Sequence, residues 1–145
     1  MNILLGVGNE LNGDDGIGVY IAKNFKCKNW KTINCATVPE NFIGKIKRYN
    51  PEKIVIVDAA DMGLKAGEIR KIKKEEIGKV SFSTHSIPLS LFISHLERYT
   101  KAKIYLIGIQ PKSFYGEMSK EVKNAGTKIM KILEKDEIDK IKELR

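Results

Sequence analysis

The sequence has few of the residues that mark specialised protein classes. It contains two cysteines, four prolines and one tryptophan among 145 residues. Cys27 and Cys35 are too few for a disulfide framework and lack metal-ligand spacing, so we expect small, buried or half-buried thiols in a reducing cytoplasm. No apolar run reaches the ~18–20 residues needed to cross a bilayer. The start of the chain, Met1-Asn2-Ile3, also lacks the basic residues of a signal peptide. A cytoplasmic protein without membrane insertion is expected.

What the chain does contain is typical of one globular domain. Hydrophobic residues make up 42% and charged residues 30%, a balance that excludes intrinsic disorder. We therefore expect a single soluble domain over residues 1–145 that acts as a monomer, with the last ten residues as a helical extension or tail.

Basic residues are missing from particular stretches, although the net charge is +8. Four windows hold no lysine or arginine: Met1 to Ala22, Ile54 to Leu64, Val80 to Glu97, and Ile104 to Pro111. The first two windows carry four of the six aspartates. Carboxylates without basic neighbours suit a metal cation or an acid with a raised pKa, and not a phosphate. The pattern indicates an acidic functional face.

Strand-like and helix-like segments alternate along the chain. Strands are expected at residues 2–7, 32–37, 53–58, 68–72 and 103–109, and helices at 15–26, around 42–49, from Pro88 to about Tyr99, and after a cap at Ser119. This alternation predicts an α/β fold, a mainly parallel twisted sheet of about five strands with helices on both faces. In such sheets ligands bind beyond the carboxyl ends of the strands. The four basic-free windows should therefore converge on one edge.

The glycines after the first strand superficially resemble a dinucleotide-binding fingerprint. Their spacing is G-x-G-x4-G from Gly6 to Gly13, two aspartates follow, and no acid ends the second strand. A pyrophosphate needs the shorter spacing and a free helix start. A strained turn that uses glycine is therefore favoured over nucleotide binding.

Three side chains are candidates for metal or acid–base chemistry at that edge. Asp15 comes after the first expected strand, Asp58 ends the strand at 53–58, and His85 precedes the Pro88 helix. Two carboxylates with one imidazole form a minimal site with open positions. Asp14 is expected to cap the helix that follows it, and Asp61 to form a turn with Gly63. A nucleic-acid partner is not expected, because no basic stripe with interleaved aromatics is present.

Several segments carry a family resemblance, in the same order over about residues 3–135. They are Gly6-Val7-Gly8-Asn9, Gly13-Asp14-Asp15-Gly16-Ile17-Gly18, Pro39-Glu40-Asn41, Val57-Asp58-Ala59-Ala60-Asp61-Met62-Gly63, Thr84-His85-Ser86, Pro88-Leu89 and Gly108-Ile109-Gln110-Pro111. Together they resemble the NiFe-hydrogenase maturation endopeptidases, in particular the branch that serves hydrogenase 3 of formate hydrogenlyase.

This resemblance implies a specific activity. Members of the family remove a C-terminal extension from the hydrogenase large-subunit precursor after nickel insertion. Their metal-contacting positions fall on Asp15, Asp58 and His85, with Asp15 where some relatives carry Glu. The resemblance thus implies an aspartic-type endopeptidase whose nickel is carried by the substrate, without a tightly bound organic cofactor. Two alternatives stay open: a nickel-dependent binding or chaperone module that does not cut, and another α/β metal-dependent hydrolase.

Overall fold

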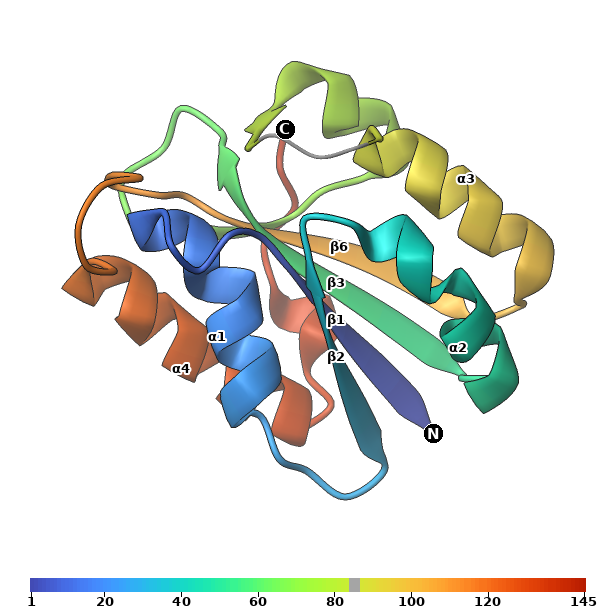
Figure 1. The fold of residues 1–145 in the computed structure, drawn as a ribbon. Coiled ribbons are helices and arrows are strands. Elements are labelled where there is room, and N and C mark those ends of the chain that lie inside the picture. The colour runs from blue at the N-terminus through green and yellow to red at the C-terminus, as the bar shows by residue number, and fades with distance from the viewer. Residues whose placement is uncertain (84–86) are drawn as a thin grey trace.

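A twisted sheet lies at the centre of the computed structural model, which describes residues 1–83 and 87–145 (Figure 1). Its strand order is β2-β1-β3-β6-β4, and β5 pairs with β3. The strands are β1 (Asn2–Val7), β2 (Trp30–Ala36), β3 (Lys53–Asp61), β4 (Ile69–Lys71), β5 (Ser81–Phe82) and β6 (Lys103–Ile109). β1, β2, β3 and β6 are parallel, whereas β4 and β5 run antiparallel to their neighbours. The predicted mainly parallel sheet is confirmed.

Helices cover both faces of this sheet, as predicted (Figure 1). The α-helices are α1 (Ile17–Asn24), α2 (Ile43–Tyr49), α3 (Leu89–Tyr99) and α4 (Lys120–Glu134). Short 3-10 helices are η1 (Gly13–Gly16), η2 (Pro39–Phe42), η3 (Lys74–Lys79) and η4 (Ile138–Lys140). α1 and α4 pack on one face, and α2 and α3 pack on the other. No helix in the described part of the chain is long and apolar enough to span a membrane.

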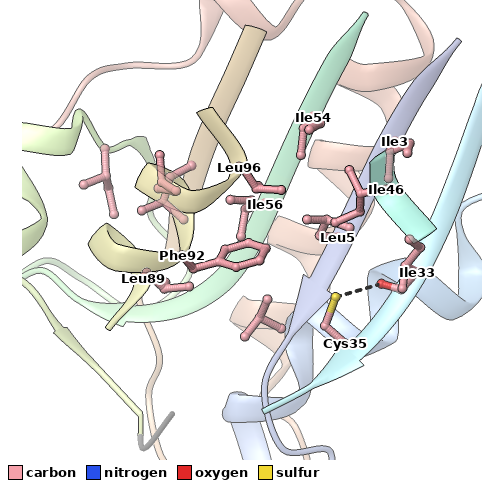
Figure 2. Close-up of a cluster of buried hydrophobic side chains, with 14 of the residues drawn as sticks. Ile3, Leu5, Ile33, Cys35, Ile46, Ile54, Ile56, Leu89, Phe92 and Leu96 are labelled. Carbon is pink, nitrogen blue, oxygen red and sulfur yellow. Dashed lines mark hydrogen bonds between the residues drawn. The ribbon is translucent and has the colours of Figure 1, made fainter. Parts of the chain in front are cut away.

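The central strands are apolar on both sides because both of their faces are covered. In β3, Ile54 and Ile56 belong to the cluster under α2 and α3, while Val55 and Val57 belong to the cluster under α1 and α4. Figure 2 shows the first of these clusters, in which Phe92 of α3 packs among the aliphatic side chains of the strands. This alternation places the sheet between two separate cores.

The two cysteines are free thiols, as expected. Cys35 is buried in the same cluster, and its Sγ lies 3.8 Å from the carbonyl oxygen of Ile33 (Figure 2). Burial, and after it the nearby charge of Glu40, raises the pKa of the Cys35 thiol to about 12. Cys27 is half-buried. Cys35 therefore acts as a small core residue and not as a nucleophile.

Helix α1 lies against the backbone of the sheet at Gly18. A Cβ atom at this position would lie 2.4 Å from the carbonyl oxygens of both Val7 and Val57. Only glycine allows so close an approach. The start of α1, and η1 before it, is thereby fixed above the carboxyl ends of β1 and β3.

Among the boundaries that differ from the sequence-based expectation, three bear on the site. The helix predicted from Asp15 begins as the 3-10 turn η1, and α1 itself starts at Ile17. Pro88, predicted in the first turn of its helix, is instead the N-cap of α3. β3 continues past Asp58 to Asp61, because the two-residue strand β5 pairs with its last residues, Ala60 and Asp61. A two-residue strand has no periodicity that a sequence could reveal.

The last ten residues are neither a helical extension nor a frayed tail. After η4 the chain runs extended beside β4: the Lys71 N–H donates to the Lys142 carbonyl, and the Leu144 N–H donates to the Lys71 carbonyl, both at 2.8 Å. Ile138 and Ile141 are buried in the cluster of α1 and α4, whereas Leu144 packs against the cluster of α2 and α3. This C-terminal segment crosses the β4 edge of the sheet and contacts both cores.

Candidate functional site

The predicted convergence takes place at the carboxyl ends of β1, β3 and β6. The loop after β1 contains Gly8 and leads into η1, and the loop after β6 contains Pro111 to Ser119 and leads into α4. In Figure 1 the η1 turn and the β6–α4 loop lie side by side at the same end of the sheet. The first, second and fourth basic-free windows therefore meet at one edge, as the parallel sheet requires.

Gly8 lies beside the backbone of Asp15 and the carboxylate of Asp58. Its φ of +142° is one that side-chain-bearing residues rarely adopt, and its N–H donates to the Ala36 carbonyl at 2.8 Å. A Cβ atom here would lie 2.0 Å from the Asp15 carbonyl oxygen and 3.7 Å from Asp58 Oδ1. The turn therefore brings η1 and the Asp58 carboxylate to the same point, with no side chain between them.

Only one of the two carboxylate oxygens of Asp15 accepts a hydrogen bond. The residue is buried in η1, and its Oδ2 accepts a 3.0 Å hydrogen bond from the Asn9 N–H. Its Oδ1 is also buried and has no hydrogen-bond partner among residues 1–83 and 87–145. A buried carboxylate oxygen without a donor is costly unless a cation or a proton is supplied. Oδ1 is therefore suited to a cation or to an ordered water.

Asp58 lies inside a strand and not at its end. The residue is fully buried, and it is paired in register with Gly108 of β6. By the two-residue period of a strand, Asp58 is on the same face as Ile54 and Ile56, whose side chains belong to the core under α2 and α3. The extension of β3 therefore corrects the predicted position of Asp58 but keeps it at the carboxyl edge, beside Gly8.

Asp14 has a structural role different from the predicted cap of its own helix. Its carboxylate is fully buried and accepts hydrogen bonds from the Lys112 N–H at 2.7 Å, the Ser113 N–H at 3.2 Å, and the Ser119 N–H and Oγ–H at 2.6 and 2.9 Å. Ser119 in turn caps α4, as predicted, by accepting from the Val122 N–H. Asp14 thus fastens η1 to the loop before α4.

Asp61 forms the predicted turn and is held by a residue that sequence reasoning did not assign a role. Its Oδ1 accepts from the Gly63 N–H at 3.2 Å and from Gln110 Nε2 at 3.1 Å. The bond from Gln110, followed by that from Gly63, lowers the pKa of Asp61. Gln110 also accepts from the Met62 N–H at 2.7 Å. The buried amide of Gln110 therefore joins the end of β6 to the loop after β3.

His85 lies outside the described residues, so the structure places two of the three predicted site residues. Within residues 1–83 and 87–145, no group of three histidine, cysteine, aspartate or glutamate side chains is arranged to hold a metal ion. The described part of the site is a pair of buried aspartates around Gly8.

Two hollows of the surface are lined by the loops around this pair. One, of about 280 Å³, is lined by Gly8 to Leu11 and the end of β2. Another, of about 480 Å³, is lined by Asp61 and by residues 110–115 of the β6–α4 loop. A third hollow, of about 360 Å³, follows the amino-terminal half of β6 and is lined by several lysines. The first two therefore involve the loops that hold the site, whereas the third lies elsewhere on the sheet.

Comparison with known proteins agrees with this arrangement. A model of the hydrogenase maturation protease family matches residues 17–136, a range that includes Asp58 and His85 and begins just after Asp15. The hydrogenase 3 maturation protease of Escherichia coli is 39% identical over 141 residues, which cover 92% of this chain and 88% of that protein.

Solved structures give the same result at the level of the fold. A crystal structure of a hydrogenase 3 maturation protease superposes with a TM-score of 0.90 at 35% identity, covering 100% of this chain and 97% of that one. The [NiFe] hydrogenase maturation protease HycI of Thermococcus kodakarensis KOD1 superposes with a TM-score of 0.82 at 30% identity, covering 94% and 91%. The family model, the sequence identity and the fold thus agree, and this chain belongs to the hydrogenase maturation protease family.

Proposed function

We propose that the protein is an endopeptidase that removes the C-terminal extension of a NiFe-hydrogenase large-subunit precursor after nickel has been inserted. The observation that carries the proposal is that two buried aspartates lie next to Gly8, Asp15 through its backbone carbonyl and Asp58 through its carboxylate, in a chain that belongs to this family. Nickel enters the reaction as part of the substrate, and Asp15, Asp58 and His85 complete its coordination.

The chemistry of the donors supports nickel recognition. Carboxylate and imidazole groups are ligands for borderline divalent metals, and three of them leave positions open for ligands from the precursor. The Asn9 N–H holds Asp15 through Oδ2, so that Oδ1 is left for the ion. Nickel in the precursor would thereby fix the scissile peptide relative to the protein.

The hydrolytic step needs an attacking water and a proton acceptor. One of the two carboxylates acts as the general base, takes a proton from the water as its oxygen attacks the scissile carbonyl carbon, and returns a proton to the leaving amide nitrogen. Because both aspartates are buried, bulk water is kept away from their carboxylates. The role of the protein is therefore to hold the peptide and to move one proton.

The test is a mass-spectrometric trimming assay on the precursor, with and without nickel. The nickel-loaded precursor should lose its C-terminal extension, and the nickel-free precursor should stay intact. Asp15→Asn, Asp58→Asn and His85→Ala should each abolish trimming and keep the native circular dichroism spectrum. His95→Ala and Asp139→Asn, which change the same residue types elsewhere, serve as matched controls and should trim normally.

Two results would contradict the proposal. Retention of the nickel-loaded precursor without shortening would identify a binding module that does not cut. Indifference to the precursor, combined with hydrolysis of small metal-dependent substrates, would identify a different hydrolase. Full activity in any one of the three site variants would remove that residue from the mechanism.

A further inference from the structure

Large apolar side chains are exposed next to the candidate site. Five are exposed in the described part of the chain: Leu11, Leu91, Tyr99, Phe114 and Tyr115. Three of these belong to the two loops that flank Asp15, with Leu11 86% exposed, Phe114 39% and Tyr115 87%. Scattered exposed apolar residues need no explanation, but a group beside a candidate site does. We call Leu11, Phe114 and Tyr115 the apolar rim.

The two loops of the apolar rim are in direct contact. The Asp14 N–H donates to the Ser113 carbonyl at 2.9 Å. A Cβ atom on Gly13 would lie 2.8 Å from the Ser113 carbonyl oxygen and 2.9 Å from the Tyr115 nitrogen. Gly13 is two residues after Leu11, so the loop that carries Leu11 lies directly beside residues 113–115.

This surface is held in place before any partner binds. The buried Asp14 carboxylate holds the β6–α4 loop through the backbone of Lys112, Ser113 and Ser119. The Leu11 N–H donates to Asn9 Oδ1 at 2.9 Å, and the Tyr115 N–H donates to Ser113 Oγ at 3.1 Å. Exposed apolar groups on a prearranged backbone lose little conformational entropy on binding, which favours recognition.

Two charged residues beside the apolar rim are paired within the chain. Lys112 lies 3.1 Å from Glu121, and Glu10 lies 2.6 Å from Lys23. The one cation of these two loops, Lys112, is therefore neutralised and is not free to hold a phosphate group. A partner that matches them presents apolar side chains.

We propose that the apolar rim binds apolar side chains of the precursor polypeptide beside its scissile bond. The inference rests on the proposed function, because it assigns the occupant from the continuity of the rim with the Asp15 and Asp58 site. The hollow that begins at Gly8 is lined by Leu11, and the hollow along the β6–α4 loop is lined by Phe114 and Tyr115, so both contain residues of the rim. The rim thus contributes to affinity and register, and the aspartates carry the chemistry.

The test measures binding separately from cleavage. Leu11→Ser and Tyr115→Ser are made in an Asp58→Asn background, in which cutting should be abolished, and the Kd of each for the nickel-loaded precursor is compared with that of Asp58→Asn alone by biolayer interferometry. Each rim variant should raise Kd at least about fivefold, the ratio expected when an interface side chain contributing ~1 kcal/mol is lost. Tyr115→Phe keeps the apolar ring and should bind like the parent.

Tyr99→Ser is the matched control. Tyr99 is also an exposed tyrosine, 52% accessible, but it lies at the end of α3 beside Lys47. Its replacement should change Kd less than twofold. In the cutting background, the rim variants should lose trimming through a higher KM.

Three outcomes decide the inference. An unchanged Kd in both rim variants overturns it, even if the native protein trims the precursor normally. A precursor that is bound through the rim but never shortened contradicts the proposed function and leaves the rim standing. A change in sedimentation coefficient caused by the rim substitutions, with an unchanged Kd, would show that a second copy of the chain covers this surface instead.

Discussion

Two adjacent aspartates in η1 have opposite surroundings. Asp14 accepts four hydrogen bonds from the loop before α4, whereas Asp15 accepts one from Asn9 and keeps Oδ1 without a partner among the described residues. The satisfied carboxylate is structural, and the unsatisfied one is available for ligand chemistry. Adjacent identical residues are thus distinguished by their hydrogen-bond donors alone.

The anchoring role of Asp14 predicts a large effect on stability. Asp14→Ala leaves the buried N–H groups of Lys112, Ser113 and Ser119 without their acceptor, so the free energy of unfolding should fall by about 3 kcal/mol. Urea denaturation followed by circular dichroism measures the change. Ser119→Ala removes one donor and the cap of α4 and should cost ~1 kcal/mol. Equal stability of Asp14→Ala and the parent protein would refute the anchoring role.

The partners of Asp14 also show where sequence reasoning ends. An aspartate before a helix is typical of a helix cap, which is the role predicted for it. The observed donors lie 98 to 105 residues away and are mostly backbone N–H groups, which every residue except proline carries. No pattern of residue types could reveal them. Asp15 and Asp58, by contrast, were predictable as neighbours from the order of parallel strands.

Helix α1 is the element on which the position of the site depends most. Its contact with the carbonyl oxygens of Val7 and Val57 at Gly18 sets the height of η1 above the sheet. The helix itself was predictable from its apolar spacing, but a glycine in a helix pattern does not reveal the backbone that it touches. The closeness of α1 to the sheet is therefore a tertiary property.

Two glycine substitutions in helices should have opposite effects. In Gly18→Ala the added Cβ would lie 2.4 Å from two carbonyl oxygens, so α1 must shift and stability should fall by about 3 kcal/mol. Gly44 in α2 has nothing within 4 Å of an added Cβ, so Gly44→Ala should stabilise by ~0.5–1 kcal/mol. Thermal unfolding of both variants provides the comparison. A loss of similar size in both would mean that packing at Gly18 is not the cause.

At the scale of the whole molecule, the C-terminal segment links the two cores. Ile138 and Ile141 enter one core, Leu144 contacts the other, and the backbone between them pairs with β4. The alternation of charge and isoleucine in residues 136–145 fits a helix, but the pairing with Lys71 favours an extended chain. This pairing also covers an edge of the sheet that would otherwise expose unpaired backbone groups.

Deletion of residues 138–145 should therefore destabilise the entire domain. Loss of the buried Ile138 and Ile141 side chains should lower the free energy of unfolding by roughly 3–6 kcal/mol. Removal of Arg145 alone, which lies beyond the pairing with β4, should have little effect. Urea unfolding of the two shortened chains measures both changes. If the longer deletion unfolds at the parent's urea concentration, the segment does not hold the cores together.

The hydrogen bonds from the β6–α4 loop to Asp14 allow the side chains of that loop to differ among related proteins. Asp14 holds residues 112 and 113 through main-chain N–H groups, so the fastening does not depend on which side chains those residues carry. Leu11, Phe114 and Tyr115 can be exchanged while the loop keeps its course. Substitution of these few exposed side chains could thus change which precursor is bound during evolution, while the aspartates of the site stay the same.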